Sequence, residues 1–98
     1  MAKKIVVDAG HGGADSGAVG NGIVEKDYTL KISKYIYDRL KDMNIDTSMT
    51  RETDVTLNPT DRVKKAQKFY GTGSDVIVLS NHINAGGGTR KNVVNITI

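Results

Sequence analysis

The chain has 98 residues, enough for one domain near the lower size limit for folding on a hydrophobic core alone. With 38% apolar and 26% charged residues it resembles a globular protein, and the lack of cysteine excludes disulfides and thiolate metal sites. The net charge of +3 suits an anionic polymer, but scattered basic residues with four tyrosines and one phenylalanine argue against nucleic-acid binding. The apolar run at residues 5–7 is too short for a signal peptide or a membrane span, so we expect synthesis in the cytoplasm without a signal peptide, and no membrane binding.

The first half of the chain predicts a strand, a long loop, a helix and a second strand. Residues 4–8 form a short β-branched run typical of a buried parallel strand. Residues 9–22 contain six glycines, which predicts a loop that bends tightly or closely approaches another group. Residues 45–50 alternate apolar and polar side chains and predict a strand less buried than the first. Residues 26–43 predict an amphipathic helix, because five apolar residues recur at helical spacing: Tyr28, Ile32, Ile36, Leu40 and Met43.

The second half predicts another helix and at least one more strand. Asn58 as N-cap and Pro59 at the first helical position indicate a helix start, and this helix ends at the glycines of residues 71–73. Residues 75–80 predict a third strand, the most hydrophobic in the chain, and residues 92–98 fit one further short strand. The alternating order predicts an α/β fold in three layers, with a mostly parallel sheet flanked by helices and right-handed crossovers.

The two histidines of the chain each follow a predicted strand. His11 comes after the first strand and His82 after the third, and ligands of parallel sheets gather at the carboxyl ends of the strands. A single histidine is usually structural, but two at one edge of a sheet favour a metal site such as zinc, which takes His and carboxylate ligands. Glu25 opens the first helix and fits equally a third ligand and a carboxylate that complements the helix dipole.

Phosphate binding is a weaker interpretation of the glycine-rich loop. Residues 12–17 match neither of the two common phosphate-binding glycine patterns and contain no lysine. Asp15 within this segment would also repel an anion.

Five segments form a specific series along the chain: residues 7–13, 15–22, 25–27, 50–54 and 80–85. Together they resemble the opening of the zinc-dependent N-acetylmuramoyl-L-alanine amidases, the amidase-3 family of autolysins and phage endolysins. The resemblance covers roughly residues 3–89. It implies cleavage of the amide between N-acetylmuramic acid and L-alanine in peptidoglycan, so the cell wall is the expected partner and site of action, reached after lysis or phage-mediated release.

The same resemblance implies roles for individual residues. One Zn²⁺ is expected on His11, Glu25 and His82, where it would activate a water molecule and polarise the scissile carbonyl. Arg51 and Asn84 occupy landmark positions and are expected to shape the site or bind substrate. Asn84 fits equally an orienting partner of His82 and a simple turn residue.

The sequence also departs from the family pattern. Glu25 and Glu52 are its two glutamates, and no acidic residue follows Asp75, so the family's late general-base glutamate has no counterpart here and the catalytic residue is unassigned. We therefore expect the amino-terminal part of a truncated amidase domain in residues 1–89 and a divergent tail in residues 90–98, with one possible extra strand.

Because of this departure, three interpretations of the chain remain open. The chain is an amidase, or a catalytically impaired fragment that binds zinc and cell wall or another partner, or a purely structural α/β fragment. An incomplete domain would also leave the third strand with an apolar edge, which predicts self-association unless the tail covers it.

Overall fold

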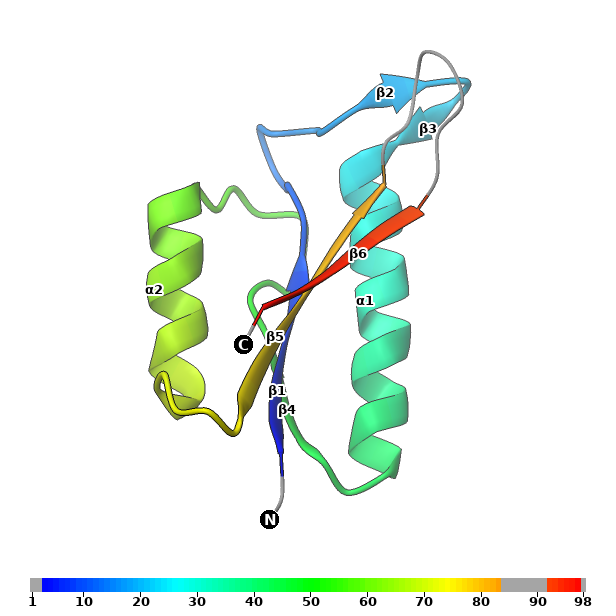
Figure 1. The fold of residues 1–98 in the computed structure, drawn as a ribbon. Helices are drawn as coiled ribbons and strands as arrows, with labels where there is room; N and C mark the ends of the chain where they lie inside the picture. Colours follow the sequence, from blue (N-terminus) through cyan, green and yellow to red (C-terminus); the bar gives the residue numbers. More distant parts are fainter. Residues whose placement is uncertain (1–2, 84–91, 98) are drawn as a thin grey trace.

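The computed structural model describes residues 3–83 and 92–97, in which a central sheet separates two helices (Figure 1). The described sheet has the order β4-β1-β5-β6, formed by Asp46–Met49, Lys4–Ala9, Val76–Ile83 and Asn92–Thr97 respectively. Strand β1 runs parallel to both β4 and β5, whereas β6 is antiparallel to β5. The predicted three-layer α/β fold with a mostly parallel sheet is confirmed.

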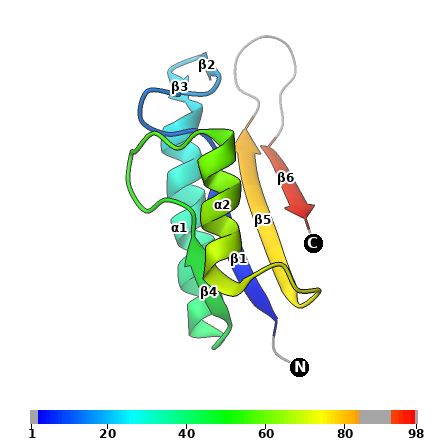
Figure 2. The same cartoon turned by 90° about the vertical axis from the view of Figure 1, so that its left-hand side faces the viewer.

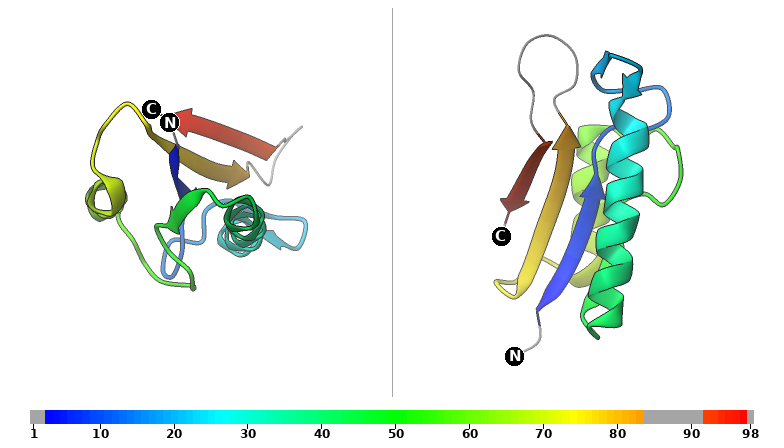
Figure 3. Two further views of the ribbon diagram at one scale, coloured as in Figure 1. Left: turned by 90° about the horizontal axis from the view of Figure 1, so that it is seen from below. Right: turned by 90° about the vertical axis from the view of Figure 1, so that its right-hand side faces the viewer.

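Each face of the sheet carries one helix. Helix α1, Glu25–Asp42, lies on one face and helix α2, Pro59–Tyr70, on the other (Figures 2 and 3). Among the described residues no helix is long and apolar enough to cross a membrane.

The loop before α1 contains a small hairpin that the sequence prediction missed. Strands β2, Val19–Gly20, and β3, Ile23–Val24, pair antiparallel across a two-residue turn. The turn residues Asn21 and Gly22 have φ angles of 51° and 76°. Positive φ at both central positions is the requirement of a type I′ hairpin turn, and Asn-Gly is the residue pair that meets it best.

The core forms on both faces of β1. Val6 and Val7 point to opposite faces, and each is 0% exposed, which explains why this strand is continuously apolar. Val6 packs with Ala66 of α2 and Val76 of β5. The strand is therefore fixed by burial on both sides, so the position of its carboxyl end is fixed as well.

Helix α1 faces the sheet through a different side than predicted. Its buried residues are Glu25, Thr29 and Ser33, one helical turn apart, whereas Tyr28 is 41% and Met43 is 63% exposed. The prediction was wrong for these two residues, while the other three members of the apolar stripe are half-buried. Short polar side chains let the helix approach closely, and the Thr29 hydroxyl donates a hydrogen bond of 2.6 Å to a backbone carbonyl after β1.

The edge of β5 is covered within the chain. Strand β6 pairs antiparallel with residues 78–83 of β5. Self-association of the chain stays a prediction.

A buried carboxylate ties the elements together at the carboxyl end of the sheet. Asp8 of β1 is 6% exposed and accepts hydrogen bonds from Thr50, Ser80 and Arg62, at 2.7, 2.7 and 2.6 Å. Burial raises the pKa of this carboxyl, but the hydrogen bonds from Arg62, Ser80 and Thr50 together outweigh it and hold the pKa below its ordinary value. Ionised Asp8 therefore stabilises the folded chain.

The Asn58 cap of α2 provides one test of this fold. The Asn58 side chain accepts a hydrogen bond of 2.8 Å from the backbone N–H of Asp61, as the sequence predicts. Asn58→Ala should lower the free energy of unfolding by about 1 kcal/mol because it leaves that N–H without its partner. Asn58→Ser is the matched control, since a serine hydroxyl caps about equally well and places no second carboxylate beside Asp61. Denaturant unfolding measures both, and an unchanged midpoint in Asn58→Ala would contradict the assignment.

Asp8 provides a pH-dependent test. Its folded-state pKa lies below the unfolded value, so its stabilisation is present above the unfolded value and is lost as the pH falls through the folded one. Asp8→Asn should lower the free energy of unfolding by about 3 kcal/mol near neutral pH, and the difference should shrink as the pH falls below the unfolded-state pKa of the carboxyl. Asp46→Asn, at an exposed position of β4, is the control with little expected effect. A difference that does not depend on pH would contradict this role.

Candidate metal centre

His11 is held in an unusual backbone conformation just beyond β1. Its φ of 63° lies in the left-handed region, which costs a non-glycine residue roughly 1–2 kcal/mol. Arg62 of α2 compensates by donating a hydrogen bond of 2.9 Å to the His11 carbonyl. This conformation turns the chain out of the sheet at His11, the residue that carries the imidazole.

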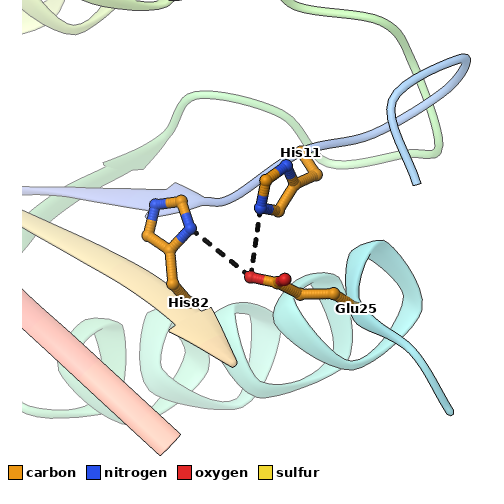
Figure 4. Close-up of side chains that lie close together, drawn as sticks. All are labelled: His11, Glu25 and His82. Atoms are coloured by element: carbon orange, nitrogen blue, oxygen red, sulfur yellow. Dashed lines mark ion pairs between the residues drawn. The ribbon is translucent and has the colours of Figure 1, made fainter. Parts of the chain in front are cut away.

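Glu25 is the first residue of α1 and one of the most buried charged residues described, at 3% exposed. The backbone N–H of Ala18 donates a hydrogen bond of 3.0 Å to Oε1 of Glu25, and the Glu25 N–H donates in turn to the Ala18 carbonyl at 3.0 Å. The carboxylate is thus held from the glycine-rich loop, with Oε2 directed at the two histidines (Figure 4). A residue at this position also complements the helix dipole, and the two roles are compatible.

His82 lies within β5, not beyond its end as predicted. The strand continues to Ile83 because β6 pairs alongside it, and His82 itself is opposite Val93. Strands β1 and β5 are neighbours, and their parallel pairing aligns Ala9 with Asn81. His11 and His82 follow these two aligned residues, so they meet at one edge of the sheet.

The three predicted ligands converge on one point (Figure 4). Nε2 of His11 is 3.1 Å and Nδ1 of His82 is 3.5 Å from Oε2 of Glu25, and one ligand atom from each residue lies within 4.8 Å of the others. The imidazole rings are perpendicular, with centroids 5.2 Å apart. Ligands about 2.1 Å from a tetrahedral zinc lie roughly 3.4 Å from one another, so these spacings and this donor set fit Zn²⁺.

Two glycines leave the space that the rings occupy. A Cβ atom on Gly10 would lie 2.6 Å from Cε1 and Nδ1 of His82. A Cβ atom on Gly17 would lie 2.6 Å from Cδ2 of His11 and 2.8 Å from Cβ of Glu25. Such distances are too short for any side chain, which confirms the predicted close approach in the glycine-rich loop.

Arg51 is buried beside the segment that leads from β1 to His11. It is 1% exposed, and its guanidinium donates to the carbonyls of Ala9, Gly10, Lys26 and Thr53 at 2.9–3.1 Å. Burial lowers the pKa of this guanidinium from its ordinary value, and the charge of Arg62 adds to the effect. The expectation that Arg51 shapes the site or binds substrate stays a prediction.

Asn84, the other residue expected to bind substrate, lies outside the described residues. Its role stays a prediction.

Two hydrogen-bonded loop carboxylates were not identified from the sequence. Asp54 accepts hydrogen bonds from the Lys26 ammonium at 2.8 Å and from the Gly13 N–H at 2.7 Å, and these bonds lower the pKa of its carboxyl. Asp15 accepts from the Gly17 N–H and contacts the His11 ring; the hydrogen bond with His11 and then that from Gly17 lower its pKa. Asp54 lies far in sequence from both of its partners, so no local pattern reveals it. Asp15 binds Gly17 and His11 within four residues, but its contact with the ring depends on the loop conformation.

Comparison with known proteins identifies the family. The profile described as N-acetylmuramoyl-L-alanine amidase (amidase-3) matches residues 5–96. The endolysin of Bacillus phage SPP1 is 44% identical over 86 residues, which cover 87% of this chain and 30% of the endolysin. The N-acetylmuramoyl-L-alanine amidase CwlM of Bacillus licheniformis is 40% identical over 88 residues, which cover 88% of this chain and 33% of CwlM.

Solved structures agree with the sequence comparison. An N-acetylmuramoyl-L-alanine amidase from Clostridium difficile 630 aligns with a TM-score of 0.78 and 31% identity, over 90% of this chain and 48% of that chain. The catalytic domain of CwlV from Bacillus (Paenibacillus) polymyxa var. colistinus aligns with a TM-score of 0.74 and 34% identity, over 88% of this chain and 48% of that chain.

The chain thus spans about a third of the length of these curated relatives and about half of the length of these solved structures. The profile match includes residues 90–96 of the predicted tail, and the domain boundary at residue 89 stays a prediction. The match over most of the chain, the relatives and the shared fold together show that this protein belongs to the N-acetylmuramoyl-L-alanine amidase family.

Proposed function

We propose that this chain forms the zinc-binding part of an amidase that hydrolyses the amide between N-acetylmuramic acid and L-alanine in peptidoglycan. The observation that carries the proposal is the convergence of His11, Glu25 and His82 within 4.8 Å. Two imidazole nitrogens and one carboxylate oxygen form a common donor set of catalytic zinc sites, which keep a fourth position open for water. Family membership supplies the substrate class.

The residues of the chain have distinct parts in this proposal. His11 and His82 offer neutral nitrogens, and Glu25 supplies the negative charge that offsets part of the charge of the cation. The Ala18 N–H holds one Glu25 oxygen at 3.0 Å, so the other oxygen remains directed at the metal position. When bound, zinc would lower the pKa of its water and polarise the scissile carbonyl.

A second candidate is a chain that binds zinc and cell wall without turning substrate over by itself. One observation favours it: of the two glutamates, Glu25 belongs to the metal centre and Glu52 is exposed beyond β4, and no acidic residue follows Asp75. A general base is needed for the proton of the attacking water and for the leaving amine. In this candidate that carboxylate is not supplied by these 98 residues.

Zinc titration of the metal-stripped chain tests the centre. Calorimetry should give one zinc per chain, and His82→Ala or Glu25→Gln should weaken binding by more than the roughly 10–100-fold typical of outer partners. Glu52→Gln is the matched control, because it removes the same charge from the only other glutamate and should leave affinity unchanged. Equal affinities in Glu25→Gln and Glu52→Gln would overturn the ligand assignment.

Turnover of purified peptidoglycan separates the two candidates. Hydrolysis releases a free amino group on L-alanine, which can be labelled and counted. Zinc-dependent release by the wild type, abolished in His82→Ala, is the result expected of the amidase. Zinc binding without release identifies the second candidate, and no zinc binding contradicts both.

A further inference from the structure

The two ring nitrogens of His11 face different carboxylates. Nε2 points to the metal position, 3.1 Å from Oε2 of Glu25, and Nδ1 is 2.9 Å from Oδ2 of Asp15. A histidine that binds a metal through one nitrogen carries its proton on the other, and the partner of that proton sets the tautomer and the ring orientation. Asp15 occupies the position of such a partner.

Asp15 is held in place although its side chain is 61% exposed. Its Oδ1 accepts a hydrogen bond of 3.1 Å from the Gly17 N–H, which leaves Oδ2 for the imidazole. Its backbone exchanges two hydrogen bonds with Gly12, at 2.8 and 3.0 Å, directly beside His11. The carboxylate is therefore anchored at its backbone and at one oxygen, so its second oxygen has a defined direction.

We propose that Asp15 is a positioning residue of the metal centre: it accepts the Nδ1–H of His11 and so presents Nε2 as the unprotonated ligand nitrogen. The inference rests on the proposed zinc site. Asp15 does not touch the metal position itself; it acts through the His11 ring, by fixing the orientation of that ring and by making Nε2 a more basic ligand.

His82 offers an internal comparison. Its Nδ1 is the nitrogen nearest Glu25, so the two histidines use different nitrogens towards the same point. The chain contains only these two histidines, so an NMR spectrum of the zinc-loaded, ¹⁵N-histidine-labelled protein separates them. We expect His11 bound through Nε2 with a protected Nδ1–H, and His82 bound through Nδ1.

The substitution Asp15→Asn tests the proposal. The carboxylate uses two acceptor oxygens, whereas the asparagine amide has only one. The variant cannot satisfy both the Gly17 N–H and the His11 Nδ1–H. We expect zinc affinity to fall roughly 10–100-fold and the His11 Nδ1–H signal to lose its protection from solvent exchange.

Asp54→Asn is the matched control. Asp54 is also an exposed loop carboxylate with both oxygens engaged, by Gly13 and Lys26, but it contacts no histidine. It should change zinc affinity less than about threefold and leave the Nδ1–H signal intact, compared with the 10–100-fold expected for an orienting partner. Asp15→Ala, which removes both acceptors, is the second variant and should weaken binding at least as much as Asp15→Asn. Thermal melts of the metal-free chains verify that all variants fold.

The outcomes are distinguishable. A fall in affinity and loss of the protected signal in both Asp15 variants, absent in Asp54→Asn, supports the proposal. Wild-type affinity in the Asp15 variants, or equal losses in Asp15→Asn and Asp54→Asn, overturns it while the zinc site stands. A wild-type chain that binds no zinc overturns this inference and the proposed function together.

Discussion

Buried Arg51 and half-buried Arg62 hold the segment in which β1 leaves the sheet, and the candidate centre depends on them. A strand that ends inside a protein leaves backbone carbonyls without partners, and such groups are costly to bury. Arg51 donates to the carbonyls of Ala9 and Gly10, and Arg62 donates to those of Ala9 and His11. Three successive carbonyls are thus satisfied by side chains from other elements, so the chain can turn sharply and present His11 at the sheet edge.

Removing the two guanidinium charges from water costs free energy, and carboxylate, carbonyl and hydroxyl oxygens around them offset this cost. The Asp8 carboxylate pairs with Arg62 at 2.6 Å, and the Arg51 guanidinium is surrounded by carbonyl oxygens and the Thr29 hydroxyl. The same contacts join β1, α1 and α2, so the fold itself helps to fix the segment that carries His11. Preorganisation of this kind favours metal binding because little ordering remains to be done when the ion arrives.

Much of the fold could be predicted from sequence because local signals coincide with tertiary demands. The Asn58-Pro59 helix start and the apolar run of β1 are examples, and neighbouring parallel strands bring His11 and His82 together. Asn21-Gly22 carried a recognisable hairpin signal that was overlooked among the surrounding glycines. Other features have no local signal. Helix α1 is buried through Thr29 and Ser33 because it packs closely on the sheet. Arg51 is buried because its hydrogen-bond partners include residues far along the chain.

In the proposed centre, two imidazoles and one carboxylate bind a single zinc ion. X-ray absorption at the zinc edge of the chain loaded with one equivalent of zinc tests it most directly. The account predicts two imidazole nitrogens, recognised by their outer-ring scattering, and oxygen ligands, all at about 2.0–2.2 Å. A spectrum with oxygen ligands alone, or with a single imidazole, would contradict it.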